Sequence, residues 1–413
     1  MKGYGERGWR RSTLTDSQVL RWVAPLLRWR YPCLVVAAYG FSLQHLRGTG
    51  KDWHYFELGS ELLFGQHHRY SPLPGGLHLY ANYPDLQIGP LSFLVATPFR
   101  ILSRTDGRIA VALLCTAVAP ALIYVLEQTA RTVWHQDGRR SEELLGMTVL
   151  LGGLVVVQSW SFLATVYAHL DDVLVLSGCT VAVWAVAKRR PWLVGTALGL
   201  AMAAKPWGIV ALPLVLALPG RDRWRASGIA GAITALAWLP FVVGDPATLS
   251  ALRPAVLTQP ASVLHLFGLP LIDAPLWVRP VQLGAALVAG TLAVARGRWG
   301  AVLLVGVATR VALDPEVFFY YSAGLLLAAL AWDLLRSPRP LPAWSLAGFV
   351  LLNDATVVIS SPTGLAVLRL AVTAAAVGLV VLLPGRKAAD AAVPLRPGRA
   401  AGPAEAGPAA ECP

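Results

Sequence analysis

Long apolar runs recur along almost the whole chain, and short polar or basic turns separate them. A helix that crosses a hydrocarbon core of about 30 Å needs about 20 apolar residues, and most of the runs approach that length. We therefore predict an all-α polytopic membrane protein, a bundle of about 12 transmembrane helices. The predicted spans are 31–46, 108–125, 144–162, 173–187, two short helices within 192–219, 226–243, 281–295, 299–313, 316–335, 343–359 and 364–383.

Clusters of basic residues between the apolar runs set the predicted orientation. Six arginines lie within residues 1–30, and further clusters lie at 131–140 and 188–190. Lysine and arginine favour cytoplasmic loops, so we predict a multi-pass protein of the cell (plasma) membrane with both termini in the cytoplasm. The predicted divisions are the basic segment 1–30, a transmembrane domain over 31–383 and a tail at 384–413, which lacks periodicity and is expected to be disordered.

The charge pattern also decides the path of two ambiguous stretches. Residues 192–219 begin and end beside basic clusters, so we predict two short helices broken at Lys205-Pro206, with Lys205 on the outer side. Residues 86–102 are almost long enough to cross. Pro90 and Pro98 interrupt them, however, and a crossing there would place later basic clusters on opposite sides. We predict a helix that lies at the outer interface.

The first outer loop, residues 48–107, is unusually long and rich in polar and aromatic residues. It holds two predicted interface helices, 55–64 and 86–102. Structureless loops of this length are uncommon and are usually functional. We therefore expect the first outer loop to form the catalytic face, and a second outer loop, residues 244–280, to lie on the same side.

Composition excludes a soluble protein and a nucleic-acid partner. The chain is 55% hydrophobic and only 14% charged, whereas a soluble domain is about a quarter charged. The net charge of +12 comes from clusters between the apolar runs, so anionic membrane lipids are the expected partners and nucleic acid is not. The four cysteines have neither metal-ligand nor disulfide spacing.

The unusual polar residues fall on one side of the predicted membrane. None of them indicates function alone, because ionisable groups at the membrane edge cost little. Their common location is what needs an explanation. The set comprises Asp52, His54, His67, His68, Asp85, Gln87, His169, Asp171, Asp172, Lys205, His265, Asp314 and Glu316.

Asp52 is the candidate general base. It follows the first span, and the aromatic residues after it, beginning with Trp53, can hold the loop at the headgroup level. A carboxylate at that place can take a proton from an acceptor hydroxyl within hydrogen-bond reach. The alternative is a solvated loop aspartate beside Lys51.

Two further groups are substrate-binding candidates with structural alternatives. Asp85 and Gln87 follow Tyr83-Pro84, a sequence typical of an ordinary turn. His169, Asp171 and Asp172 can order a sugar or bind a metal ion, although acidic residues there can equally cap the helix that follows. No further ligand spacing supports a divalent cation, so we expect no metal and no cofactor.

Lys205 and Arg310 are the candidates for binding a phosphate. A lysine within an apolar segment is costly and normally faces a cavity or a partner. Lys205 can stabilise an anionic leaving group, or its side chain can simply extend to the interface. Arg310 lies four residues before Asp314 and can pair with it on one helix face.

These features together resemble the GT-C superfamily of membrane glycosyltransferases. The acidic residue early in a long first outer loop, here Asp52, matches, and residues 198–207, Leu-Gly-Leu-Ala-Met-Ala-Ala-Lys-Pro-Trp, resemble a segment of glycosyltransferase family 87. That family includes polyprenyl-phosphate-mannose-dependent mannosyltransferases. The resemblance implies a GT-C-like fold, Asp52 as catalytic base, and Lys205 or His265 on the donor phosphate. The sequence departs from the family at 168–172, where a Gly-Gln or Gly-His entry is usual, which puts acceptor contacts in doubt.

The sequence therefore predicts an inverting glycosyltransferase at the outer face of the membrane. It would move a sugar, mannose or another, from a polyprenyl-phosphate donor to a lipid or glycan acceptor. No glycine-rich phosphate loop indicates a nucleotide site. The alternative is a transporter or lipid-linked-sugar flippase, which would be expected to have matching broken helices in both halves, whereas only the Lys205-Pro206 break is evident. A non-catalytic scaffold would leave the one-sided polar set unexplained.

Overall fold

A computed structural model describes residues 25–65, 73–137, 142–252, 256–336 and 341–382, where every regular element is a helix. Within these residues, six helices are long and apolar enough to cross a membrane. The helical membrane character is thus confirmed. The six are α6 (Arg104–Asp137), α7 (Glu142–Ser161) with its extension η4 (Phe162–Tyr167), α8 (Leu170–Ala187), α10 (Gly220–Gly244), α12 (Val278–Ala295) and α17 (Pro362–Leu382).

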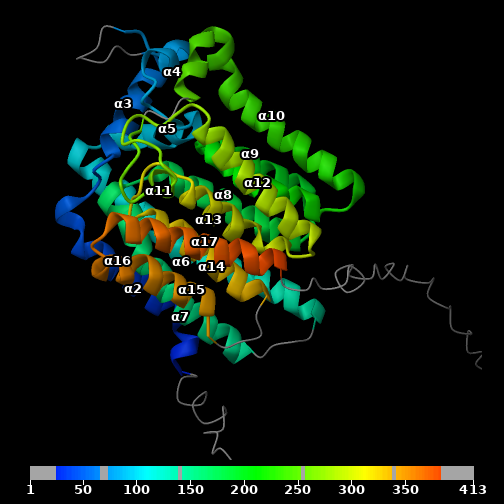
Figure 1. Ribbon diagram of the computed structural model, residues 1–413. Coiled ribbons are helices and arrows are strands. Elements are labelled where there is room, and N and C mark those ends of the chain that lie inside the picture. The colour runs from blue at the N-terminus through cyan, green and yellow to red at the C-terminus, as the bar shows by residue number, and fades with distance from the viewer. Residues whose placement is uncertain (1–24, 66–72, 138–141, 253–255, 337–340, 383–413) are drawn as a thin grey trace, which may run out of the picture.

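Shorter helices fill the remaining predicted spans (Figure 1). Each predicted span therefore corresponds to a helix or to consecutive helical segments, while the number of crossings stays a prediction. The predicted tail at 384–413 and most of segment 1–30 lie outside the described residues. The shorter elements are α2 (Arg30–Gln44), α9 (Pro191–Ala204), η5 (Pro206–Ala217), η7 (Trp299–Ala301), α13 (Val302–Ala312), α14 (Tyr321–Arg336), α15 (Ala343–Phe349), η8 (Val350–Asp354) and α16 (Ala355–Val358).

Several predicted boundaries were wrong, and α10, which was expected to begin at 226, begins at Gly220. The helix expected at 108–125 runs from Arg104 to Asp137, so Arg131 is helical rather than in an inner loop. Its guanidinium lies 2.7 Å from Glu127 one turn earlier and 2.7 Å from Glu142 of α7, and these pairs extend the helix. The span expected to begin at 316 begins at Tyr321, since the preceding aromatic residues form the turn.

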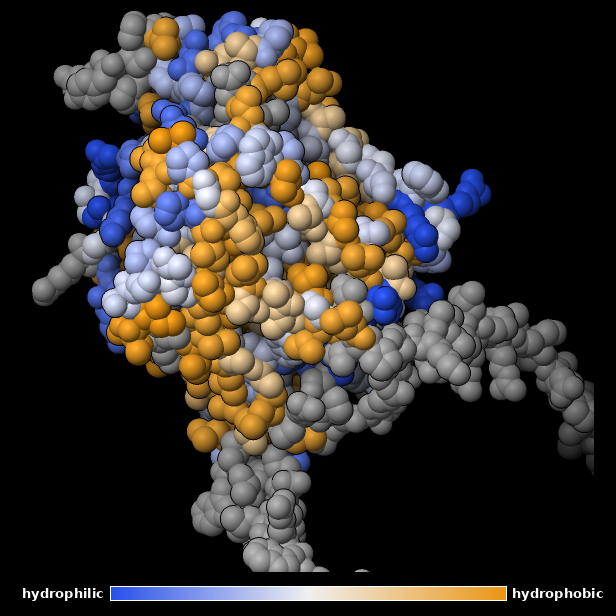
Figure 2. All heavy atoms as spheres, viewed as in Figure 1, coloured by the Kyte–Doolittle hydropathy of each residue, from blue (hydrophilic) through white to orange (hydrophobic). Residues whose placement is uncertain are grey.

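The bundle exposes a large apolar surface, as a membrane protein requires. Figure 2 shows hydrophobic residues over much of the visible face, with hydrophilic residues gathered toward its left and right edges. In the most apolar 18-residue stretch of α10, only 17% is buried within the protein, and the same share is buried in α17. Apolar side chains such as Leu236, which is 76% exposed, therefore face outward and are suited to lipid.

The first outer loop folds into short helices at one end of the bundle. They are α3 (Trp53–Leu63), η2 (Gly76–His78), α4 (Leu79–Asn82), α5 (Pro90–Ala96) and η3 (Thr97–Ile101). In Figure 1, α3, α4, α5 and α11 (Val263–Leu266) gather at this end. Helices thus form in both stretches where interface helices are predicted, while their location at the interface stays a prediction, and α5 with η3 is too short to cross a core of about 30 Å. The second outer loop contains η6 (Pro246–Leu252) and α11.

Small residues let α9 pack closely between α8 and α10. A Cβ atom on Gly195 would lie 2.5 Å from the carbonyl oxygen of Ala226, and one on Gly199 would lie 2.7 Å from Ile233 Cβ. Small residues at such contacts allow membrane helices to approach backbone to backbone. This packing fixes the end of α9, where Lys205 lies, against the start of α8.

Candidate functional site

A π-helix holds Asp52 at the end of the bundle that is predicted to be outer. The N–H groups of Gly50, Lys51 and Asp52 donate in register to the last three carbonyls of η4, at 2.8, 3.0 and 3.2 Å. η4 is a π-helix, a rare form that leaves carbonyls available and is frequent at functional sites. Ala168 then takes a left-handed conformation with φ of 55°, which ends η4 and turns the chain into α8.

Asp52 forms an ion pair with His169, the residue before α8. Asp52 Oδ2 lies 2.8 Å from His169 Nε2, and His169 Nδ1 lies 3.1 Å from Asp171 Oδ1. The ring of Tyr320 stacks on the imidazole with a centroid distance of 4.3 Å. The imidazole is thus held from both nitrogens and from one face. The Asp52 side chain keeps 27% of its surface exposed, so a substrate can reach its carboxylate.

Lys205 occupies the break between α9 and η5 and binds both buried carboxylates of α8. Its Nζ lies 2.7 Å from Asp171 Oδ2 and 3.1 Å from Asp172 Oδ2. Trp207 Nε1 donates to the other Asp172 oxygen at 2.6 Å. The predicted break is confirmed: Lys205 is extended, with φ of −162° and ψ of 135°, and Pro206 begins the next element. A continuous series of contacts between charged side chains therefore runs from Asp52 through His169 and the two aspartates to Lys205.

Arg310 continues this charged region on the far side of Trp207. Its guanidinium carbon lies 4.9 Å from the centre of the Trp207 ring and 4.7 Å from that of Tyr321. Its Nη2 also lies 3.3 Å from Asp314 Oδ2, as the four-residue spacing predicts. Arg279 reaches the same oxygen at 3.2 Å. Asp314 is thus fully buried between two cations.

The environment changes the protonation of two groups outside the spans. Burial alone would lower the pKa of His169, but hydrogen bonds with Asp171 and Asp52 raise it to about 9. The imidazole is therefore positively charged at neutral pH. Burial raises the pKa of Glu316 to about 7, and the nearby charge of Asp314 contributes. Glu316 thus titrates near neutral pH.

Five of the predicted site residues come together, and others do not. The structure joins Asp52, His169, Asp171, Asp172 and Lys205 by direct contacts, with Arg310 beside them. Asp171 and Asp172 lie in the first turn of α8, although the helix has no side-chain cap at His169. The solvated-loop alternative for Asp52 is wrong, because Asp52 pairs with His169, whereas the ammonium of Lys51 faces the ring of Tyr167.

The other candidates lie in their own loops. Asp85 is exposed in a turn, where its carbonyl accepts from the N–H of Gln87 at 2.9 Å, so the turn interpretation holds. His265 Nδ1 bonds to the carbonyl of Leu269 at 2.8 Å within the second outer loop. Trp53 is buried and stacks on Phe56, so it anchors the loop. His67 and His68 lie outside the described residues.

Sequence reasoning missed the aromatic side chains that support the charged residues. Trp207, Tyr320 and Tyr167 each contact a member of the cluster. Trp207 follows the Lys205-Pro206 break directly, and Tyr320 follows the turn at Asp314. Their positions next to charged residues at helix ends were the available signal.

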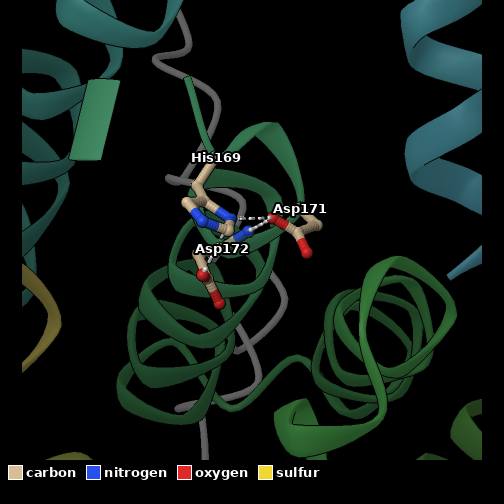
Figure 3. A group of neighbouring side chains, drawn as sticks. All are labelled: His169, Asp171 and Asp172. Carbon is tan, nitrogen blue, oxygen red and sulfur yellow. Dashed lines mark hydrogen bonds and ion pairs between the residues drawn. The ribbon is translucent and has the colours of Figure 1, made fainter. Parts of the chain in front are cut away.

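Among the described residues, His169, Asp171 and Asp172 form a group whose geometry could hold a metal ion (Figure 3). One ligand atom from each lies within 4.8 Å of the others. Lys205 nevertheless places its ammonium against both carboxylates, and Trp207 donates to one of them. A divalent cation would have to displace that ammonium or lie beside it. The donor set therefore fits a lysine better than a metal ion.

Comparison with known proteins adds no family to this picture. No family model matches the chain, and no curated protein or solved structure matches it. The resemblance to glycosyltransferase family 87 stays an expectation drawn from short motifs. Function therefore has to be argued from the site itself.

Proposed function

We propose that this protein is an inverting, GT-C-like membrane glycosyltransferase. It would transfer a sugar, mannose or another, from a polyprenyl-phosphate donor to a lipid or glycan acceptor at the outer face of the membrane. The observation that carries the proposal is the partly exposed carboxylate of Asp52, fixed by the imidazole of His169 at 2.8 Å. A base that is oriented by a second group is the arrangement that proton abstraction needs.

The proposed reaction uses Asp52 as the only base. The acceptor oxygen attacks the anomeric carbon as the bond from that carbon to the phosphate oxygen breaks, so the sugar inverts. The acceptor hydroxyl proton passes to a carboxylate oxygen of Asp52, and the polyprenyl phosphate leaves as an anion. The protonated His169, held by Asp52 and Asp171, keeps the carboxylate in one orientation.

Lys205 would act on Asp52 through this chain of charges. Because its ammonium pairs with two carboxylates, its charge is balanced within the protein before any substrate binds. We assign Lys205, Asp171 and Asp172 the task of positioning His169. Arg310, although paired with Asp314, remains a candidate for the donor phosphate because two aromatic faces, those of Trp207 and Tyr321, flank its guanidinium.

The test is sugar transfer in membranes that contain the full-length protein. A radiolabelled polyprenyl-phosphate sugar is offered to the wild type, to Asp52→Asn and to Asp85→Asn, a matched carboxylate in the same loop. We expect Asp52→Asn to lose about 100-fold or more of the rate while folding normally, and Asp85→Asn to keep it. Wild-type turnover in Asp52→Asn would refute the base assignment.

The proposed mechanism also predicts indifference to chelators. EDTA should leave both the transfer rate and the thermal unfolding midpoint of the wild type unchanged, since Lys205 rather than a divalent cation neutralises Asp171 and Asp172. If EDTA abolishes sugar transfer and added Mg²⁺ or Mn²⁺ restores it, this prediction is contradicted and a metal ion at His169 is favoured.

Transport is the second candidate, and the broken helix pair α9–η5 favours it. Discontinuous helices with charged residues at the break are typical of transporter binding sites. If the wild type transfers no sugar from any polyprenyl-phosphate donor, a flipping assay with a lipid-linked sugar in sealed vesicles becomes the deciding measurement.

A further inference from the structure

A cavity of about 580 Å³ lies at the start of the first outer loop, and two of its lining residues, Lys51 and Trp53, flank Asp52 in the chain. Its wall consists of residues 48–51, Trp53 and His54 together with the first turns of α6. Three basic residues, Lys51, Arg104 and Arg108, line it, and among the described residues no acidic residue does. The cavity is therefore strongly electropositive.

The cations are arranged around a backbone turn that only glycine permits. Gly50 has a φ of 67°, and a Cβ atom on it would lie 2.4 Å from Arg108 Cγ. The side chain of Arg108 thus packs directly over Gly50. Within the described residues, Arg108 Nε is buried and has no hydrogen-bond partner. An orphaned buried donor is costly unless a ligand or water satisfies it.

Two carboxylates of neighbouring segments are engaged, Glu57 with the cavity residue Arg104 and Asp106 with Ser103. Glu57 lies 3.0 Å from Arg104, whose side chain is 74% exposed, so that pair is weak. Asp106 accepts from the hydroxyl of Ser103 at 2.6 Å. Neither residue lines the cavity, and so the positive charge of Lys51 and Arg108 there is not cancelled.

We propose that this cavity binds a phosphate group. Guanidinium and ammonium donors are the groups that recognise phosphate in proteins, and the positive end of the α6 dipole adds to their field. Asp52 lies in the chain between Lys51 and Trp53, which both line the cavity, and Lys51 lies over Tyr167, whose ring is 5.9 Å from that of His169. A phosphate bound there is adjacent to the proposed base, as the phosphate of a lipid-linked substrate would be. The identification with a substrate rests on the proposed function, whereas the phosphate site does not.

Binding is measured with the full-length protein in phosphatidylcholine nanodiscs by calorimetric titration. Farnesyl phosphate is the probe, farnesol is the control that lacks only the phosphate, and inorganic phosphate lacks the lipid. The cavity variants are Arg108→Gln and Lys51→Gln. Arg100→Gln is the matched control, since Arg100 lies at the same end of the bundle, 3.2 Å from Glu61, and does not line the cavity.

We expect farnesyl phosphate to bind and each cavity variant to weaken its binding by about tenfold or more, while Arg100→Gln leaves it unchanged. Binding should also weaken as salt is raised. Variant-sensitive binding of inorganic phosphate would identify free phosphate as a sufficient ligand. Binding of farnesyl phosphate alone would identify a lipid-linked phosphate. Equal binding of farnesol, or binding that neither cavity variant reduces, would overturn the proposal.

Two comparisons separate this proposal from the proposed function. Lys51→Gln changes an exposed side chain, so it remains informative if Arg108→Gln fails to fold. Asp52→Asn should bind farnesyl phosphate as the wild type does. Phosphate binding without sugar transfer would refute the transferase and leave the cavity assignment intact. If the protein transfers sugar but neither cavity variant weakens the binding of farnesyl phosphate, the cavity assignment is refuted and the transferase stands.

Discussion

Asp52 and Asp85 are both carboxylates of the same loop, yet their surroundings differ completely. Asp85 is exposed in a turn, whereas Asp52 pairs with an imidazole that is itself bound to Asp171. Asp171 is fully buried, and Lys205 is its cationic partner within the protein. Buried charges in such a chain depend on one another, because removing one leaves its partner unpaired in a low dielectric.

Lys205→Met should destabilise the protein by about 3–5 kcal/mol, since it leaves two buried carboxylates, Asp171 and Asp172, with a single cation, the imidazolium of His169. The double variant Lys205→Met/Asp171→Asn should recover part of that loss, because the excess buried negative charge is gone. Chemical unfolding in detergent measures both. A single variant as stable as the wild type would show that the ammonium is not needed in the buried cluster.

His169 should make stability depend on pH. Its pKa is about 9 in the folded protein and 6.5 for an ordinary histidine, so the folded state holds the proton more tightly. The resulting stabilisation is complete below pH 6.5 and is lost as pH rises through about 9. The thermal unfolding midpoint should therefore fall over this window.

The matched variants for the pH experiment are His169→Gln and His265→Gln. The first should remove most of the pH dependence between 6.5 and 9, because the imidazole that titrates there is gone and Glu316, with a pKa of about 7, contributes only at the lower end. The second should retain it, since His265 bonds only to a carbonyl of its own loop. An unchanged slope in His169→Gln would assign the pH dependence to another group.

At the scale of elements, two irregular segments build the site. η4 offers its last carbonyls to the backbone of residues 50–52, and the break at Lys205-Pro206 turns the end of α9 toward α8. The first outer loop seals this break, because Gly89 N–H and the Ser92 hydroxyl both donate to the carbonyl of Ala204 at 2.9 Å. Regular helices would satisfy these backbone groups internally and leave no such contacts.

Gly89→Ala should disrupt the contact between the first outer loop and α9. A Cβ atom there would lie 2.2 Å from the carbonyl oxygen of Ala203, so the loop must move away from Lys205. We expect a loss of about 1–3 kcal/mol in stability together with reduced sugar transfer. Gly284→Ala, on α12, is the control because its Cβ would meet open space. Equal unfolding midpoints in the two variants would argue against the close contact.

At the scale of the whole molecule, each end of the bundle carries its own cluster of charged residues. The cluster around His169 lies at one end, and the pairs that tie Arg30 and Arg131 to Glu127 lie at the other end of the helices. An apolar surface joins the two (Figure 2). The positive-inside rule then predicts that the His169 end faces outward.

Cysteine labelling in intact cells tests this orientation. With the native cysteines replaced by serine, Asp85→Cys should react with a membrane-impermeant maleimide, because Asp85 is exposed at the His169 end. Arg189→Cys, exposed after the opposite end of α8, should react only after the membrane is permeabilised. The reverse pattern would refute the predicted topology and move the proposed reaction to the cytoplasmic face.

The sequence alone determined the helical membrane character, the approximate position of each apolar helix and the break at Lys205-Pro206. Lipid imposes these features locally: backbone groups must bond within a helix, charges must leave the core, and proline cannot continue a helix. Only the tertiary structure decided that Asp52 pairs with His169, that Lys205 binds two carboxylates and that Lys51 and Arg108 share a cavity. Those contacts join residues that are distant along the chain, and they depend on how helices pack and where a π-helix leaves its carbonyls free, which no local pattern specifies.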